Sequence, residues 1–180
     1  MKVLGFCGLP GSGKSTAIDA IRDLGIIITM GDVVRREAEK RGIGPTDENL
    51  GKIARELRKE GGKEIIAQKC VELIKNLEND VIFIDGVRSL AEVNVFRAIW
   101  KFPLIATIID EEFRFKRLNE RGRSDDPKTL EELKKRDGRE FSFGLNEVVE
   151  MAEYKIENTS TKEDLKDKTR KIVLGIIRDY

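Results

Sequence analysis

The chain has 180 residues, with 34 Lys plus Arg against 33 Asp plus Glu, two cysteines and no histidine. This length suits one domain with its own core. Without histidine, Ser-His-Asp and Cys-His nucleophiles, His-x-Glu deaminase sites and two-His metalloprotease helices are excluded. The formal net charge of +1 gives no general attraction to nucleic acid or to a membrane surface, so we expect neither as a partner.

Apolar runs of strand length alternate with segments of helical spacing. The runs cover residues 2–6, 26–30, 81–84, 104–109 and 154–156. Because these runs are almost continuously apolar, they predict an α/β fold with a five-stranded parallel sheet and helices on both faces, in three layers. Ligands then bind at the carboxyl ends of the strands.

The helix after the first run is predicted to carry Ala17, Ile18, Ile21 and Leu24 on one face and to stop at Gly25. No later apolar stretch approaches the 18 residues of a membrane span. We therefore expect a soluble, cytoplasmic protein, as a monomer or a small homo-oligomer. Cys7 and Cys70 are too few for a cysteine zinc site and too far apart for a thioredoxin-like pair, so we expect two buried hydrophobes.

Two long, charged connections of helical spacing interrupt the alternation. A compact sheet does not need connections of this length, which favours helical flaps over its edge. We expect a single domain in three core segments, residues 1–30, 81–110 and 153–180. A helical insertion covers about 31–80, and a lid region covers about 111–152.

A complete G-x-x-x-x-G-K-S motif lies between the first strand and its helix. Its glycines allow backbone N–H groups to face phosphate oxygens, and the helix N-terminus adds a favourable dipole. Lys14 is expected to reach the β- and γ-phosphates, and Ser15 to ligate Mg²⁺. The motif predicts a P-loop NTPase fold with an ATP site formed by Gly8, Pro10, Gly11, Ser12, Gly13, Lys14, Ser15 and Thr16.

Asp85 ends the apolar run Val-Ile-Phe-Ile-Asp, which is the arrangement of a Walker B carboxylate. A strand also commonly ends in Asp for structural reasons, but the P-loop in the same chain favours the metal role. The predicted Mg²⁺ ligands are therefore Ser15 and Asp85, with ATP as co-substrate.

Residues 161–164, Thr-Lys-Glu-Asp, match a loose guanine-reading pattern, but no Asp-x-x-Gly switch motif occurs in the chain. Thr161 followed three positions later by Asp164 predicts a helix N-cap instead. Arg114, Arg117 and Arg121 have the spacing of one helical face. We expect Arg114 to be solvated there beside glutamates, and Glu92 to lie on a helix surface.

Several segments resemble those of nucleotide kinases. Residues 30–35, Met-Gly-Asp-Val-Val-Arg, resemble the Gly-Asp-x-x-Arg segment of adenylate kinases, and residues 85–88 resemble their Asp-Gly-x-x-Arg, one residue shorter. Residues 121–126 are similar to the short lid of UMP/CMP kinases, and residues 152–158 to the segment that ends the sheet in dephospho-CoA kinases. The whole chain resembles the archaeal family of adenylate kinase-related P-loop proteins.

This resemblance implies phosphoryl transfer from ATP to a nucleotide-like acceptor such as AMP, which binds on the 31–80 insertion. It assigns Lys14, Arg88, Arg121 and Arg123 to catalysis, Arg117 and Asn158 to the ATP site, and Asp32, Arg35 and Arg88 to the acceptor. Arg136 and Arg139 compete for a further lid position. Arginine suits these roles because its planar guanidinium binds phosphate through two hydrogen bonds and keeps its proton.

Three functions remain open on these grounds. A nucleoside monophosphate kinase needs no general base, because its acceptor oxygen is already anionic at neutral pH. A dephospho-CoA kinase transfers to a hydroxyl and needs a base, for which Asp32 is available; Asp32 can instead cap a helix that begins at Val33. The third is an NTPase or nucleotide-binding regulatory module.

Overall fold

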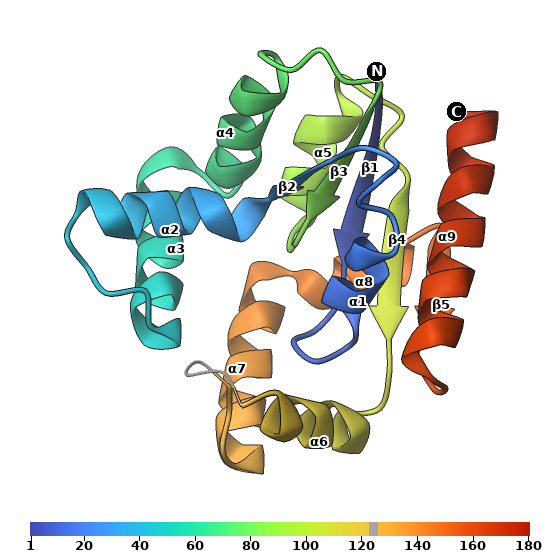
Figure 1. Ribbon diagram of the computed structural model, residues 1–180. Coiled ribbons are helices and arrows are strands. Elements are labelled where there is room, and N and C mark those ends of the chain that lie inside the picture. The colour runs from blue at the N-terminus through green and yellow to red at the C-terminus, as the bar shows by residue number, and fades with distance from the viewer. Residues whose placement is uncertain (123–125) are drawn as a thin grey trace.

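The computed structural model describes residues 1–122 and 126–180 and contains a five-stranded sheet in the order β2-β3-β1-β4-β5 (Figure 1). All of its strand pairs are parallel. The strands are β1 (Lys2–Cys7), β2 (Ile26–Thr29), β3 (Val81–Asp85), β4 (Leu104–Ile108) and β5 (Tyr154–Glu157). The predicted α/β fold, with a five-stranded parallel sheet between helical layers, is confirmed.

Helices lie on both faces of this sheet and beyond its carboxyl edge. They are α1 (Lys14–Asp19), α2 (Met30–Lys40), α3 (Asp47–Gly61), α4 (Ile65–Ile74), α5 (Leu90–Arg97), α6 (Glu111–Arg121), α7 (Leu130–Phe143), α8 (Leu145–Met151) and α9 (Lys162–Asp179). In the described part of the chain, no helix is both long and apolar enough to cross a membrane.

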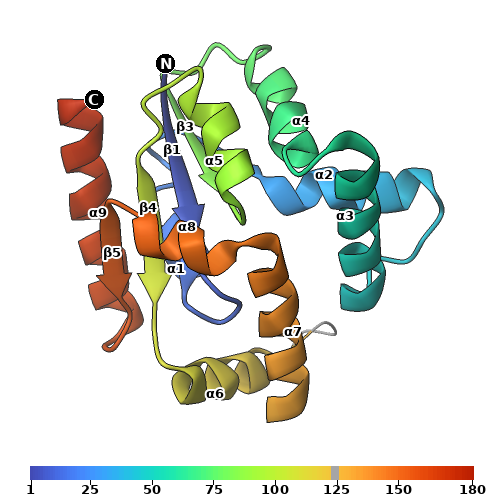
Figure 2. The same cartoon turned by 180° about the vertical axis from the view of Figure 1, so that it is seen from behind.

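Alternating side chains of the strands form two cores. Leu4 and Phe6 of β1 point to the face covered by α1 and α9, where they pack with Phe83. Val3 and Cys7 point to the opposite face, which α4, α5 and α8 cover, with α2 and α3 outside (Figure 2). Because both faces are buried, the strands need apolar side chains on both sides, as their sequences show.

Helix α1 is shorter than predicted, because it ends at Asp19 rather than near Leu24. After α1 the chain makes tighter turns, in which Leu24 N–H donates to the carbonyl of Ile21 (3.0 Å). Arg170 of α9 donates to the carbonyl of Ala20 (2.9 Å) and pairs with Asp23. If α1 continued, the carbonyl oxygen of Ala20 would accept a hydrogen bond from a backbone N–H of the next turn. Here it accepts one from Arg170 of α9 instead.

The two long connections are helical, as their spacing predicts. The connection between β2 and β3 forms α2, α3 and α4 to one side of the sheet, and α6 and α7 lie past the carboxyl ends of the strands (Figure 1). Thr161 accepts a hydrogen bond from the N–H of Asp164 (3.2 Å), so the predicted N-cap of α9 is confirmed. Cys7 and Cys70 are buried and free, also as predicted.

Candidate functional site

The loop between β1 and α1 has a backbone that only glycine adopts easily. Gly13 has φ +100°, and a Cβ on it would lie 2.1 Å from Nδ2 of Asn158. Gly8 has φ +148°, and a Cβ there would lie 2.6 Å from the Thr107 hydroxyl oxygen. Both the positive φ and the close neighbours exclude a larger residue at these positions. The glycines of the motif are therefore required by the loop's own geometry.

Neighbouring strands hold this loop from behind. The Ser12 hydroxyl is hydrogen-bonded to the Thr107 hydroxyl (2.7 Å), and both residues are buried. The Asn158 side chain donates to the Ser12 carbonyl (2.8 Å), while its backbone N–H donates to Ile108 at the end of β4 (2.9 Å). Asn158 is 3% exposed, so its side chain acts as a brace for the loop. A direct contact between Asn158 and ATP remains a prediction.

Lys14, the first residue of α1, forms an ion pair with Asp85 at the end of β3. The strand register places Asp85 opposite Phe6, near the start of the loop. Ser15 follows on the exposed surface of the first helical turn. The backbone N–H groups of that turn have no acceptor within the helix and lie at its positive end. The Lys14–Asp85 ion pair thus lies at the start of α1, the end of the helix that carries Ser15 and these N–H groups.

The oxygen donors at this point fit Mg²⁺, which prefers hard oxygen ligands. Ser15 supplies a hydroxyl and Asp85 a carboxylate that is partly exposed. Within residues 1–122 and 126–180, no group of three or more Cys, Asp and Glu is arranged to hold a metal ion. Mg²⁺ commonly binds through one or two carboxylates together with substrate phosphates, so two protein donors are compatible with it.

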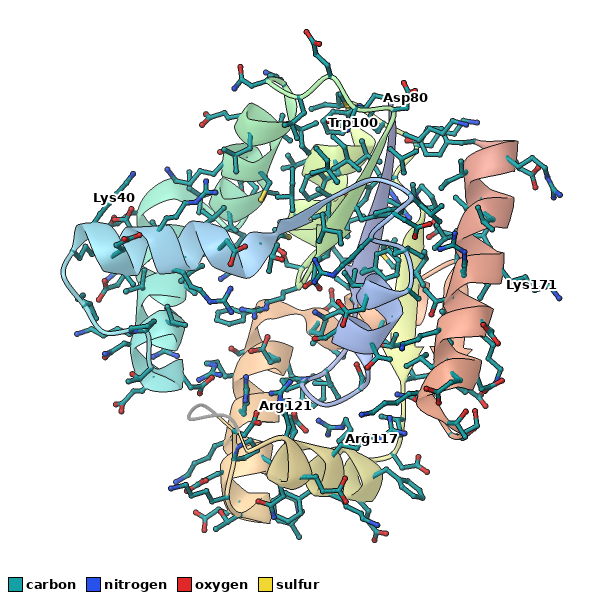
Figure 3. All side chains as sticks on the ribbon, in the orientation of Figure 1. Lys40, Asp80, Trp100, Arg117, Arg121 and Lys171 are labelled. Atoms are coloured by element: carbon teal, nitrogen blue, oxygen red, sulfur yellow. The ribbon has the colours of Figure 1, made fainter. Side chains whose placement is uncertain are left out.

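Helix α6 passes below the loop and carries two of the arginines predicted to serve the ATP site and the lid, Arg117 and Arg121 (Figure 3). Arg117 donates to the backbone carbonyl of Asn158 (3.4 Å). Arg121 donates hydrogen bonds to the Asp126 carboxylate from both Nε (2.9 Å) and Nη2. Arg123 lies outside the described residues. Arg117 therefore lies beside the predicted ATP site, and both arginines are held by contacts within the protein.

Arg114 is not on a solvated face, and that expectation is wrong. The residue is 3% exposed, and its guanidinium pairs with Asp137 of α7, which is 5% exposed. It also donates to the carbonyl of Pro10 in the P-loop (3.2 Å). The packing of α7 over α6 turns this part of the helix into an interior surface, which the helical spacing of the arginines could not indicate.

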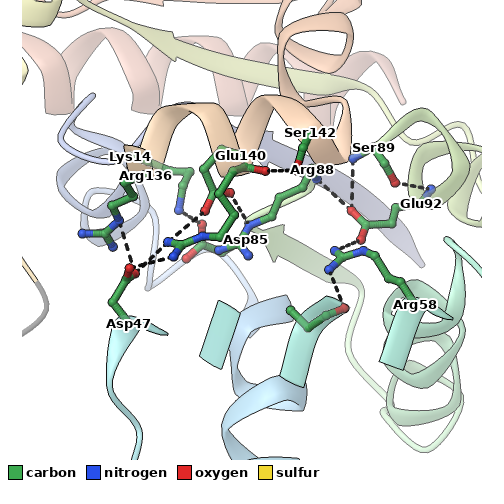
Figure 4. Close-up of polar contacts among 12 residues, drawn as sticks. Lys14, Asp47, Arg58, Asp85, Arg88, Ser89, Glu92, Arg136, Glu140 and Ser142 are labelled. Atoms are coloured by element: carbon green, nitrogen blue, oxygen red, sulfur yellow. Dashed lines mark hydrogen bonds and ion pairs between the residues drawn. The ribbon is translucent and has the colours of Figure 1, made fainter. Parts of the chain in front are cut away.

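Arg88 lies in the turn after β3, close to Asp85 in sequence (Figure 4). Its Nε is 3.1 Å from a carboxylate oxygen of Glu140 on α7, and its side chain is about one-third exposed (34%). Its backbone N–H donates to the Glu92 carboxylate (2.8 Å). The turn therefore presents the Arg88 guanidinium at the sheet edge while fixing its backbone.

Glu92 is fully buried, so the expectation of a surface glutamate is also wrong. Its carboxylate accepts hydrogen bonds from the N–H of Ser89 and from Nη2 of Arg58 on α3 (2.6 Å), and Ser89 and Glu92 form a capping box at the start of α5. The Arg58 guanidinium also lies 4.4 Å from the centre of the Phe143 ring. The Ser-x-x-Glu pattern at 89–92 is the signal that could have revealed the cap; nothing local points to Arg58.

Arg136 and Arg139 of α7 both face Asp47, in the first turn of α3. Arg139 binds both oxygens of Asp47 (2.7 and 2.8 Å), and Nε of Arg136 lies 3.5 Å from one of them. Partial burial raises the pKa of Asp47. The hydrogen bonds from Arg139 and the charges of Arg136, Arg139 and Arg88 lower it by a larger amount. The net pKa is below its usual value, and this ion-pair bridge joins α3 to α7.

Asp32 and Arg35 form an exposed ion pair one turn apart on α2. The helix begins at Met30 with Thr29 as its N-cap residue, so Asp32 lies in the first turn and does not cap a helix at Val33. The strand β2 leads directly into α2, which moves the helix start three residues earlier. The pair therefore projects from the helix end that adjoins the carboxyl edge of the sheet.

Residues 7–134 match the family model described as an AAA domain. The chain is 48% identical over 184 residues to a UPF0200/UPF0201 protein of Archaeoglobus fulgidus and spans 57% of that protein's length. It is 42% identical over 183 residues to a UPF0200 protein of Methanosarcina barkeri, with 100% of this chain and 96% of that protein covered.

Two solved structures have a similar fold. TT1252 from Thermus thermophilus matches with a TM-score of 0.63 at 19% identity, over 97% of each chain. The shikimate kinase from Acinetobacter baumannii, solved in complex with shikimate, matches with a TM-score of 0.59 at 13% identity, over 99% of this chain and 94% of that one. At these identities the likeness concerns the fold alone.

Proposed function

The chain belongs to the UPF0200 family and to the AAA-domain family, and from this premise we propose that it is an ATP-dependent kinase whose acceptor is a nucleoside monophosphate or a similar phosphate. One observation carries the proposal. The P-loop residue Lys14 pairs with Asp85 at the end of β3, and the turn that follows presents Arg88 at the same edge of the sheet (Figure 4). Donor-side and acceptor-side cations thus meet where a phosphoryl group can pass between two phosphates.

On the nucleotide side, the P-loop N–H groups and Lys14 bind the β- and γ-phosphates. Ser15 and Asp85 are the residues that would hold Mg²⁺, and Lys14 leaves Asp85 to reach the phosphates. When bound, Mg²⁺ supplies positive charge beside the transferring group. Phosphoryl transfer asks the protein mainly for positioning and for charge of this sign.

On the acceptor side, Arg88 and Arg35 bind the acceptor phosphate and direct one of its oxygens at the γ-phosphorus. That oxygen is already anionic at neutral pH, so the reaction proceeds without a general base. Arg121 and Arg123 approach the transferring group when the lid closes, and Arg117 lies beside the nucleotide. Closure excludes water, which otherwise competes as the acceptor.

A hydroxyl acceptor, as in dephospho-CoA, is the second candidate. The observation that favours it is the exposed carboxylate of Asp32, which lies in the first turn of α2 next to the carboxyl edge of the sheet. In this case Asp32 takes the hydroxyl proton as general base. An NTPase or nucleotide-dependent regulatory module is the third, and it needs no acceptor site.

Product analysis with ATP, Mg²⁺ and a panel of AMP, CMP, UMP, GMP, dTMP and dephospho-CoA tests the proposal. A phosphorylated monophosphate supports it, and 3′-phosphorylated dephospho-CoA supports the second candidate. Phosphate release that no acceptor stimulates contradicts both kinases and favours the NTPase.

Arg88→Ala separates the two sides of the site. We expect it to raise the KM for the acceptor and lower kcat while the Kd for ATP stays nearly unchanged. Arg36→Ala is the control, because Arg36 is exposed on α2 and has no assigned role. Loss of ATP binding in Arg88→Ala, with the fold intact, contradicts the assignment of Arg88 to the acceptor.

A further inference from the structure

Helix α7 presents Arg136, Arg139 and Glu140 toward α3 and the turn after β3. Glu140 is 4% exposed, although it is charged. One of its carboxylate oxygens lies 3.1 Å from Nε of Arg88, and the other lies 3.8 Å from Nη2 of Arg139 (Figure 4). The guanidinium that the proposed function assigns to the acceptor is thus already bound by a carboxylate of the same chain.

An anion that binds Nε of Arg88 must displace this carboxylate, and an anion that binds Nη1 or Nη2 is repelled by its charge. Glu140 is tethered on a helix next to its partner, so its effective concentration at Arg88 is high. A free monoanion such as acetate offers Arg88 the same chemistry as Glu140 without that advantage. A phosphate group carries close to two negative charges at neutral pH and three strong acceptor oxygens, so it binds guanidinium more strongly.

Glu140 can also release Arg88 without becoming a buried charge that has no partner. A buried carboxylate that loses its sole partner is strongly destabilised. Glu140 retains Arg139, which is itself anchored through two hydrogen bonds to Asp47. The exchange therefore replaces one partner of Arg88 and leaves the other ion pairs of α7 in place.

We propose that Glu140 is a specificity-determining residue: a tethered competitor at Arg88 that admits a phosphate dianion and excludes monoanionic acceptors. The proposal rests on the proposed function, in which Arg88 binds the acceptor, and it restricts the acceptor group at Arg88 to a phosphate. Glu140 acts through Arg88 and does not touch the acceptor itself.

The test measures how anions protect Arg88 from phenylglyoxal, a guanidinium reagent, at pH 8 with saturating ADP and Mg²⁺ to occupy the P-loop. Peptide mass spectrometry quantifies the modification of Arg88 against increasing inorganic phosphate or sodium acetate at matched ionic strength. In the wild type, phosphate should protect Arg88 at concentrations where acetate does not. In Glu140→Gln, acetate should also protect, and half-protection by phosphate should need about 5- to 20-fold less phosphate, as expected for loss of one close charged competitor.

Glu131→Gln is the matched control, because Glu131 lies on the same helix but is exposed and pairs only at 3.5 Å with Lys135. Its protection curves should follow the wild type. Equal phosphate curves in the wild type and Glu140→Gln overturn the proposal, as does equal protection by acetate and phosphate in the wild type.

A second variant keeps the proposal testable if Glu140→Gln does not fold. Glu140→Asp keeps a charge near Arg139 but withdraws the carboxylate from Arg88 by one methylene, so it should shift the phosphate curve in the same direction by a smaller factor. An unshifted curve in Glu140→Asp overturns the proposal. The protection assay involves no turnover, so it is independent of the acceptor panel. If an acceptor of the panel is phosphorylated but the protection curves do not shift, only the role of Glu140 is contradicted. If no acceptor is phosphorylated, the proposed kinase function is contradicted.

Discussion

Arg114 of α6 and Asp137 of α7 form a buried ion pair next to the P-loop. Nη1 of Arg114 lies 3.0 Å from Asp137 and 3.2 Å from the carbonyl of Pro10, so one guanidinium joins α6 and α7 to the P-loop. Both residues are at least nine-tenths buried. Arg114 therefore links α6, α7 and the P-loop in the interior of the protein.

Removing one member of this pair should be costly. Arg114→Met leaves the Asp137 carboxylate buried without its partner, and we expect it to lower the free energy of unfolding by about 3–5 kcal/mol. The double variant Arg114→Met/Asp137→Leu buries no charge and should recover most of that loss. Urea unfolding measures both, with Lys135→Met on the exposed side of α7 as the control that changes little. If the double variant is as unstable as Arg114→Met, the uncompensated charge of Asp137 is not the cause of the loss.

Lys14→Ala removes the cation that pairs with Asp85 at the P-loop. Turnover should fall by a factor of about 10³ or more, because in the proposed reaction Lys14 supplies charge where it develops in the transition state. Lys40→Ala, at the exposed end of α2, is the control. Initial rates of ADP formation measure the effect, and near-normal turnover in folded Lys14→Ala overturns the assignment of the phosphate site.

The Asp47 bridge predicts a pH dependence of stability. The pKa of Asp47 is lowered in the folded protein, so its stabilising contribution is complete above the unfolded pKa of about 4 and is lost as pH falls through the lower, folded pKa. The stability advantage of the wild type over Asp47→Asn should therefore be present at pH 6 and shrink below about pH 4. Thermal unfolding from pH 6 to pH 3 measures it, and Asp167→Asn, exposed on α9, is the control. A constant difference between wild type and Asp47→Asn contradicts the prediction.

The two cysteines should be unreactive in the native state. Burial raises the pKa of both Cys7 and Cys70 to about 12, and the thiolate is the form that reacts with alkylating agents. At pH 8, iodoacetamide should leave both thiols unmodified in the folded protein and label both in guanidinium chloride. Intact-mass spectrometry measures this, and rapid native labelling of either cysteine contradicts it.

Much of the architecture follows from local patterns. The five apolar runs became the five strands, because strands buried on both faces need continuous apolar sequence. The glycines at 8 and 13 adopt positive φ, and Thr161 caps α9 as its spacing with Asp164 predicts. Each of these features depends on residues within a few positions of one another.

The polar contacts of the lid and insertion did not follow in the same way. Arg114 and Glu92 were both expected at the surface, yet each is buried in an ion pair, Arg114 with Asp137 and Glu92 with Arg58. The partners lie 23 and 34 residues away in sequence. Local spacing cannot indicate partners this far apart, so these charges become buried only when α6 meets α7 and α3 meets α5.

The sequence by itself determined the parallel α/β fold and the phosphate loop, because hydrophobic periodicity and glycine conformation act locally. Only the tertiary structure decided which arginines form ion pairs and with which carboxylates. Arg114 pairs with Asp137, Arg88 with Glu140, and Arg139 with Asp47. Charged side chains select partners by distance in space, and α7 brings these partners together only after the chain has folded.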